Sequence, residues 1–198
     1  MLTEEKILKN YETFRALCRK LGPRADDVSN MLDHFDTRLS VAPASSRQAY
    51  HASYPGGLVD HSLRVFQNAR IMNDTFKHNI PIESLIIACL FHDFGKVGDL
   101  EQDLYLPQTN SWRADNLGEN YVYNRSIQMM PNAERGLWII QHFGIKLTMD
   151  EWLAIRLNDG PIAEENRSYS MHEPLLALIV HQADRLACHQ EKQRDSNS

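Results

Sequence analysis

Apolar side chains recur every three to four positions along most of the chain, which is the spacing of helices with one buried face. This pattern predicts helices over residues 2–21, 25–39, 58–76, 82–95, 132–143, 148 onward and 175–188. The helix at 82–95 is apolar on nearly all sides and is expected at the centre of the core. No strands alternate with these helices, so we expect an all-α bundle of about six to eight helices and not a doubly wound α/β fold.

Loop and capping residues separate the predicted helices. The segment 41–57 is rich in Pro, Gly and Ser and is expected to be a loop. Thr148 with Glu151, and Ser170 with Glu173, have the spacing of a capping box, in which each side chain bonds the backbone N–H of the other residue. Each box predicts that a helix begins there.

Two segments depart from the helical pattern. Short apolar stretches at 104–107 and 121–123 predict an irregular or β-hairpin excursion near 100–124. Its aromatic side chains have two open interpretations, which are packing of the loop onto the domain and stacking on a nucleobase. The polar residues 191–198 are expected to be a disordered tail, which leaves a single domain over 1–190.

The composition is that of an ordinary globular protein, with 198 residues of which 42% are hydrophobic and 24% are charged. The 26 acidic residues exceed the 21 basic ones, and the formal charge of −5 argues against a protein that coats duplex DNA. A small nucleotide stays compatible, because a bound cation changes the local charge. The chain shows neither a signal peptide nor an apolar run of ~18 residues, so we expect a cytoplasmic protein without membrane contact.

The cysteines point away from a disulfide framework. Cys18, Cys89 and Cys188 are the three cysteines of the chain, and none has the Cys-x-x-Cys spacing. An odd number without that spacing is typical neither of paired disulfides nor of a zinc knuckle. Each lies in an apolar, helix-like stretch and is expected to be a small buried hydrophobe.

Ionisable residues interrupt three of the most apolar predicted helices. His92 and Asp93 lie near the end of the central helix, His61 lies on the helix before it, and His181 and Asp184 lie one turn apart on the last helix. Buried ionisable groups need a charged partner or a metal, and imidazole with carboxylate suits divalent transition ions or Mg. Taken singly, each residue fits a structural histidine or an ion-paired carboxylate better than a ligand. Their coincidence on three helices favours a metal.

Residues 43–66 resemble the opening of the HD-superfamily metal-dependent phosphohydrolases, in which Gly-Gly-Leu precedes an acidic residue, His and Ser or Thr. Here residues 56–62 read Gly-Gly-Leu-Val-Asp-His-Ser. Residues 92–96, His-Asp-Phe-Gly-Lys, match the later His-Asp-x-x-Lys, and Asp184 matches a lone Asp near the C-terminus. The likeness covers about 40–190 and is closest to small single-domain bacterial and phage members and to the HD domain of a bacterial 3′–5′ exoribonuclease.

This resemblance implies a metal-binding core over about 40–190 with one divalent ion, which is Mn, Mg, Ni, Fe, Co or Zn. The ligands that match the family's motifs are His61, His92, Asp93 and Asp184. Such an ion polarises phosphorus and lowers the pKa of a bound water. Asp93 therefore counts both as a ligand and as a catalytic residue.

The same resemblance suggests further catalytic and substrate-binding residues. Lys96 follows the His-Asp pair by one helical turn and is expected to hold a phosphate oxygen, although a solvated lysine at a helix end gives the same pattern. Arg64, one turn after the first ligand, is a second candidate for neutralising charge. His51, which matches a loop histidine of the exoribonuclease-like members, is expected to contact phosphate or act as an acid, and Arg47 to bind substrate.

Two departures from the family pattern limit the number of metals. Many relatives carry two more histidines that hold a second metal or contact substrate, and here those positions are Asn132 and Asn158. Asn is a poor ligand for transition metals but a competent hydrogen-bonding group. We therefore expect one metal, with Asn132 and Asn158 contacting substrate. The HD-fold oxygenases, which use two irons, are disfavoured on the same ground.

Together these features predict a metal-dependent phosphohydrolase that cleaves a phosphoester or phosphoanhydride of a nucleotide or another phosphorylated small molecule. The alternative within this class is a 3′–5′ exonuclease or phosphodiesterase acting on RNA or DNA ends, which the acidic charge disfavours. The alternative outside it is a non-enzymatic HD-fold module that binds a nucleotide or a protein. A homo-oligomer is compatible with all three.

Overall fold

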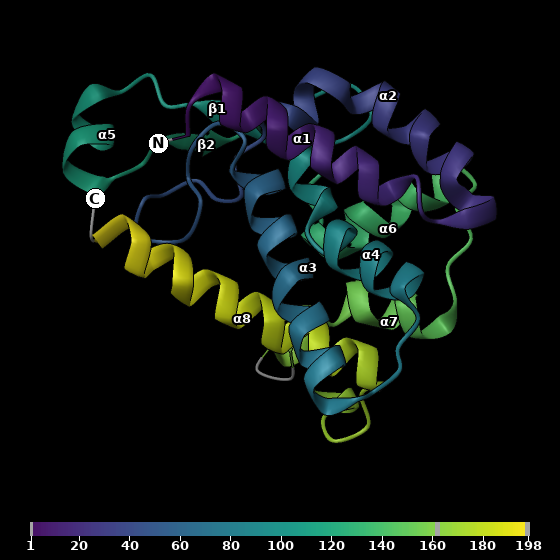
Figure 1. Cartoon of the computed structure of the whole chain (residues 1–198). Helices are drawn as coiled ribbons and strands as arrows, with labels where there is room; N and C mark the ends of the chain where they lie inside the picture. Colours follow the sequence, from purple (N-terminus) through teal and green to yellow (C-terminus); the bar gives the residue numbers. More distant parts are fainter. Residues whose placement is uncertain (1, 161–162, 197–198) are drawn as a thin grey trace.

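Helix α3 (Gly57–Phe76) lies at the centre of the fold, in contact with four other helices (Figure 1). These are α1 (Glu4–Cys18), α2 (Ala25–Val41), α4 (Ile82–Phe91) and α8 (Leu175–Ser196). The computed structural model describes residues 2–160 and 163–196 of the chain. Over this part, the expected all-α bundle with one small hairpin is confirmed.

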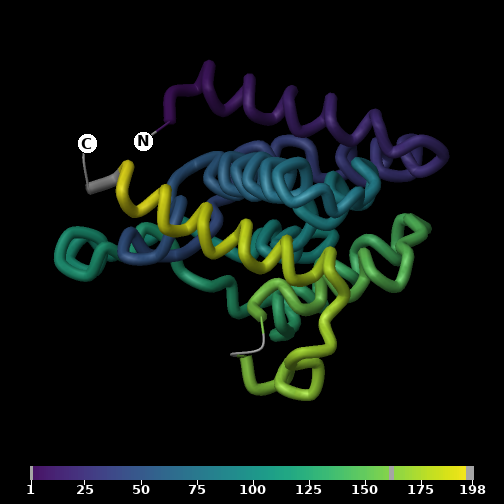
Figure 2. Tube along the Cα trace, turned by 60° about the horizontal axis from the view of Figure 1, so that its bottom comes forward, coloured from purple at the N-terminus to yellow at the C-terminus, as the bar shows by residue number. Residues whose placement is uncertain are grey.

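Shorter elements complete the bundle next to α4. Helix α6 (Asn132–His142) packs on the 3₁₀ turn η2 (Phe94–Val97), and α7 (Met149–Arg156) packs against α4, α6 and α8. The remaining elements are the 3₁₀ turns η1 (Gly22–Arg24) and η3 (Glu164–Tyr169), the helix α5 (Ser111–Leu117) and the strands β1 (Tyr105–Pro107) and β2 (Tyr121–Tyr123). Figure 2 shows α8 running along one side of the bundle, across α3. Within the described ranges, no helix combines the length and the apolar character that a membrane span needs.

Helix α4 forms the middle of the core, as its sequence predicts. All its residues from 85 to 91 are buried. The ring of Phe91 meets those of Phe14 and Phe94 edge to face, with centroids 5.7 Å and 5.3 Å away. Phe35 meets Phe94 in the same way at 5.3 Å. Such pairs add roughly 0.5–1.5 kcal/mol each beyond the burial of area, so the end of α4 is held firmly against α1 and α2.

The end of α4 differs from the prediction, which continued the helix to residue 95. The α-helix ends at Phe91, and Asp93 has φ −109° and ψ 13° before η2 begins. Tertiary packing explains the change, because a Cβ on Gly95 would lie 2.0 Å from the backbone oxygen of Asn132 on α6. In a continuous helix, neighbouring side chains point about 100° apart. The break lets His92 and Asp93 face one space.

The predicted hairpin is present, with an insertion that the sequence did not predict. Strands β1 and β2 are antiparallel, and Tyr105 lies opposite Tyr123. A tight turn does not join them, because α5 lies between the two strands. Arg47, in the loop before α3, forms a further β-bridge with Glu119. The hairpin is therefore attached to the loop that leads into the first metal-ligand helix.

The C-terminal segment differs most from the prediction of a disordered tail at 191–198. Helix α8 continues to Ser196, and residues 197–198 lie outside the described part. Glu191 is fully buried and accepts a hydrogen bond from Arg64 Nε at 3.2 Å. Arg194 donates to Asp60 at 3.2 Å. These polar side chains have buried partners, which a reading of composition alone does not reveal.

Of the two predicted capping boxes, one is confirmed. Thr148 and Glu151 form both hydrogen bonds of the box at the start of α7. The box at Ser170 is wrong, because Ser170 follows η3 and α8 begins only at Leu175. Pro174 precedes α8 instead, and its carbonyl accepts the first helical bond, from the N–H of residue 178. Proline suits this place because the first turn of a helix needs no N–H from it.

Glu151 also links α7 to distant parts of the fold. It is 1% exposed and accepts hydrogen bonds from Arg24 Nη1 at 2.7 Å and from the Ser84 hydroxyl at 2.8 Å. Burial raises the pKa of Glu151, but these bonds, that of Arg24 first, outweigh burial and hold the pKa below its usual range. We predict that Glu151→Gln lowers the free energy of unfolding by about 2–4 kcal/mol at pH 7, measured by chemical denaturation, because it leaves Arg24 without its charge partner.

The pH dependence of this contribution has a defined sign. Because folding lowers the pKa of Glu151, the contribution is complete above the unfolded pKa of about 4.3 and is lost as the pH falls through the folded pKa. The difference between the wild type and Glu151→Gln should therefore shrink in acid. Asp150→Asn, at the exposed neighbouring position, is the control and should change stability by less than about 0.5 kcal/mol. Equal stability of Glu151→Gln and the wild type at pH 7 would contradict the prediction.

Candidate metal centre

The four predicted ligands meet where α3, the end of α4 and α8 come together. His61 Nε2 lies 3.0 Å from Asp184 Oδ1 and 3.8 Å from Asp93 Oδ2. His92 Nε2 lies 3.4 Å from Asp93 Oδ2 and 3.9 Å from Asp184 Oδ1. The structure therefore brings the whole predicted set together, from three elements that are far apart in the sequence.

These separations fit a single divalent ion. Atoms that lie about 2.1 Å from one ion are about 3.0 Å apart when adjacent and about 4.2 Å apart when opposite. All four measured distances fall within this range. The Nε2 atoms of His61 and His92 are buried, and among the described residues they have no hydrogen-bond partner. Two unsatisfied imidazole nitrogens facing two carboxylates are a donor set that a divalent cation completes.

Hydrogen bonds on the outer side orient both histidines. His61 Nδ1 lies 3.2 Å from each carboxylate oxygen of Glu191, and His92 Nδ1 lies 2.8 Å from the carbonyl oxygen of Cys89. When Nδ1–H donates outward, Nε2 offers its lone pair to an ion. Sequence reasoning missed Glu191 because it assigned this residue to the tail. The available signal was its helical spacing, two turns after Asp184 on the same face.

Burial and close partners set the charges of the ligands. Burial lowers the pKa of His61, but Asp184 and Glu191 outweigh it and raise the pKa to about 10, so His61 releases a proton when its Nε2 binds an ion. Burial raises the pKa of Asp184, but His61 outweighs it and lowers the pKa to about 2. Burial also opposes ionisation of Asp93, yet Lys96 holds the pKa of this carboxyl well below its usual range. Both aspartates are therefore anionic at neutral pH, which is the form that binds a cation.

A cavity of about 360 Å³ opens beside Asp184. Its walls come from the loop before α3, the hairpin, the start of α6 and α8. They carry cationic, aromatic and amide side chains, which include Lys96, Arg185, Lys192, Tyr50, Tyr105, Tyr123 and Asn132. A second cavity of about 350 Å³ adjoins the first, since both are lined by Ser46, Tyr50 and Tyr123. The candidate metal centre is thus accessible to a small ligand from one side.

The family model that describes the HD domain matches residues 58–188, a range that includes all four predicted ligands. The chain belongs to the HD-domain family. No curated protein and no solved structure matches the chain. HD domains are in general metal-dependent phosphohydrolases, and the matched range of this chain contains the adjacent pair His92-Asp93.

Three of the predicted catalytic and substrate-binding residues line the cavity of this HD domain, namely His51, Lys96 and Asn132. Lys96 Nζ donates to Asp93 Oδ2 at 2.6 Å. The ring of His51 lies 4.5 Å from that of His61, between centroids. Burial, followed by the charges of Lys96 and His61, lowers the pKa of His51 to about 3. His51 is therefore neutral at neutral pH, which disfavours the expected role of an acid. A neutral imidazole has one ring nitrogen whose lone pair can bind a metal or accept a hydrogen bond.

The other three predicted residues lie outside this cavity. Arg64 Nε donates at 3.2 Å to Glu191, the residue that contacts His61 Nδ1. Arg47 is ion-paired within the second cavity. Asn158 is 4% exposed and donates to the carbonyl oxygen of His92 at 3.3 Å. Arg64 and Asn158 thus contact residues around the predicted ligands, while their predicted roles in catalysis and in substrate binding stay predictions.

Four side chains of α8 that the sequence did not assign to the site also line the cavity, namely His181, Arg185, Cys188 and Lys192. Cys18 and Cys89 are buried, as expected for small hydrophobes. Cys188 differs, because it is only partly buried and its Sγ lies 3.5 Å from Asp184 Oδ1. The signal in the sequence was the spacing of four residues between Asp184 and Cys188, which places both on one helical face.

We predict that Glu191→Gln raises the Kd for Mn²⁺ by about 10–100-fold, because an outer carboxylate orients a ligating imidazole and strengthens its donor atom. Isothermal titration calorimetry measures the change. Gln193→Ala, at an exposed position of the same helix, is the matched control and should bind Mn²⁺ like the wild type. Wild-type affinity in Glu191→Gln and in a chain that stops after residue 190 would show that Glu191 has no positioning role.

Proposed function

We propose that this HD-domain protein hydrolyses a phosphoester or phosphoanhydride bond of a nucleotide or a nucleotide-like small molecule, with one divalent ion as cofactor. The observation that carries this proposal is that one cavity combines a metal ligand, Asp184, with cationic and aromatic walls. The cavity volume of about 360 Å³ suits a small organic ligand. The cationic side chains suit the phosphate end of a nucleotide, and the aromatic side chains suit its base.

Lys96 supports the phosphate end of this proposal. Its ammonium group has three N–H donors, and its hydrogen bond to Asp93 uses one of them. With its side chain 12% exposed, Lys96 is desolvated, and a charge in such a place stabilises developing negative charge more than in water. Arg185 and Lys192 line the same cavity from α8. An ion bound by the four ligands supplies an activated water and positive charge beside the phosphoryl oxygens.

Aromatic side chains support the nucleobase end. Tyr50 and Tyr123 line the cavity and are 51% and 52% exposed, so each offers a ring face. Tyr105 is 6% exposed, and its ring centroid lies 5.2 Å from that of Tyr123. Both interpretations of the aromatic residues in the 100–124 excursion thus have support, because Tyr105 packs the hairpin down while Tyr123 is open to stacking.

Two variants test the proposed hydrolase. Asp93→Asn should lose Mn²⁺ binding and reduce hydrolysis to below about 1% of the wild type, because it removes a ligand. Lys96→Met should bind Mn²⁺ but lower kcat by about 100-fold. The substitution removes a positive charge that stabilises the negative charge developing on the phosphoryl group in the transition state. The measurements are calorimetry and phosphate release, with nucleoside mono-, di- and triphosphates and Mn²⁺, Mg²⁺, Ni²⁺ or Co²⁺. Asp150→Asn serves as the control variant.

The screen also separates the hydrolase from a binding module. Binding of Mn²⁺ and of nucleotides without hydrolysis of any nucleotide or short oligonucleotide would replace the enzyme by the non-enzymatic alternative. Full hydrolysis by Asp93→Asn would exclude catalysis at this centre.

The second cavity favours one further candidate, a 3′–5′ exonuclease or phosphodiesterase. It adjoins the first through Tyr50 and Tyr123, and Arg125 lines it at an exposed position. If a strand end is the substrate, Arg125→Ala should raise the KM for a dinucleotide or longer oligonucleotide by about 10-fold and leave that for a mononucleotide unchanged, because it removes one phosphate contact. If the KM for the oligonucleotide is the same in Arg125→Ala as in the wild type, this candidate is rejected.

A further inference from the structure

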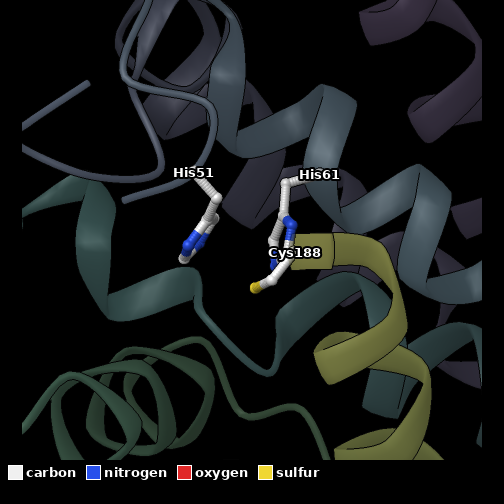
Figure 3. A group of neighbouring side chains, drawn as sticks. All are labelled: His51, His61 and Cys188. Carbon is white, nitrogen blue, oxygen red and sulfur yellow. The ribbon is translucent and has the colours of Figure 1, made fainter. Parts of the chain in front are cut away.

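A second group of metal-ligating atoms includes His61 but not His92. Ligand atoms of His51, His61 and Cys188 all lie within 4.8 Å of one another. Figure 3 shows these side chains turned toward one another, with His51 on the loop before α3, His61 on α3 and Cys188 on α8. The group contains a thiol, which the His-Asp ligand set lacks.

Two further observations mark this group as a binding site. His51 Nε2 is buried and has no hydrogen-bond partner among the described residues, and the same holds for His61 Nε2. Asp184 Oδ1 lies 3.0 Å from His61 Nε2 and 3.5 Å from Cys188 Sγ. Two nitrogens and one sulfur therefore lie close together, and an oxygen of Asp184 adjoins His61 and Cys188.

We propose that His51, His61, Asp184 and Cys188 form a second, thiolate-containing site that binds Zn²⁺. Donor atoms of a tetrahedral Zn²⁺ lie about 3.3–3.6 Å apart, so the ligand atoms of His51, His61 and Cys188, which lie within 4.8 Å of one another, move closer together to close on the ion. The Zn–S bond forms as the Cys188 thiol releases its proton to solvent. Thiolate favours Zn²⁺ over Mg²⁺ and Mn²⁺, which prefer oxygen ligands.

The two sites exclude one another. Glu191 holds Nδ1 of His61 through both carboxylate oxygens, so Nε2 is the one atom that His61 offers to an ion. A single nitrogen lone pair serves one ion, and Asp184 is likewise shared. Zn²⁺ in the thiolate site therefore displaces the ion held by the His-Asp set.

The thiolate site is also closed. Four protein ligands fill a tetrahedral shell, whereas a catalytic zinc keeps one position for water. Zn²⁺ bound there is inhibitory, a consequence that rests on the proposed hydrolase function, whereas the binding of Zn²⁺ itself does not.

Cobalt spectroscopy tests the site without any assay of activity. The probe is Co²⁺, which absorbs in the near ultraviolet when a thiolate binds it. We expect this band in the wild-type chain, and we expect Cys188→Ser to lose it and to raise the Kd for Zn²⁺ by about 100-fold, because serine is a poor ligand for this ion. The Mn²⁺ affinity of Cys188→Ser should stay within about 3-fold of the wild type, because Mn²⁺ uses the oxygen-rich set.

The opposite variant completes the test. His92→Asn removes a ligand of the His-Asp set that the thiolate site does not use, so it should lose Mn²⁺ binding and keep the cobalt–thiolate band. His51→Gln should weaken that band. If Cys188 bound Co²⁺ without His51, this substitution would leave the band unchanged. Absence of the band in the wild type, or its persistence in Cys188→Ser, would overturn the proposal.

Hydrolysis gives a separate reading. If the chain is a phosphohydrolase, Zn²⁺ should inhibit the Mn²⁺-loaded wild type and inhibit Cys188→Ser only at about 100-fold higher concentration, because the closed site is lost. If no phosphoester is hydrolysed, the proposed function fails while the cobalt band still decides whether the site exists. Equal inhibition of both chains by Zn²⁺ would overturn the inhibitory role.

Discussion

The packing of α8 on α3 is the contact on which the candidate metal centre depends. It brings Asp184 to within 3.0 Å of one nitrogen of His61 and Glu191 to within 3.2 Å of the other. The apolar face of α8, which includes Val180 and Ala183, is fully buried and sets the rotation of this helix. Asp184 and Glu191 are two turns apart on α8 and therefore lie on the same side of the helix. Asp184 is a predicted ligand, and Glu191 orients the ligand His61. An imidazole between two carboxylates is thus a consequence of helix packing.

A polar network holds the same region from outside. Asp60, the residue before His61, is 6% exposed and accepts hydrogen bonds from Asn10 at 2.9 Å, Tyr54 at 2.8 Å and Arg194 at 3.2 Å. These partners come from α1, from the loop before α3 and from the end of α8. A buried carboxylate without such partners would be strongly destabilising. The network therefore joins three segments around the first ligand, while apolar packing of α4 holds the second.

The sequence could predict what depends on local spacing and could not predict what depends on tertiary contact. Helical periodicity placed the main helices, and the motif residues that resemble the HD family named four side chains that the structure brings together. The sequence did not assign Glu191 and Cys188 to the site, because their places there follow from the length and rotation of α8. The composition of the polar end of this helix is typical of a disordered segment. The sequence also did not predict that α4 ends at Phe91, because the contact between Gly95 and Asn132 joins two elements that no local pattern connects.

The distribution of donor atoms around His61 determines which ions compete for this centre. At Asn132 and Asn158, where the family resemblance leads one to expect histidines, the chain offers amides, and Asn158 is used to hold the His-Asp pair from behind. Further nitrogen and sulfur donors lie near His61, at His51 and Cys188. An oxygen-rich and a thiolate-containing set thus share the single free nitrogen of His61. Because one lone pair binds one ion, the softness of the available metal decides which set is filled.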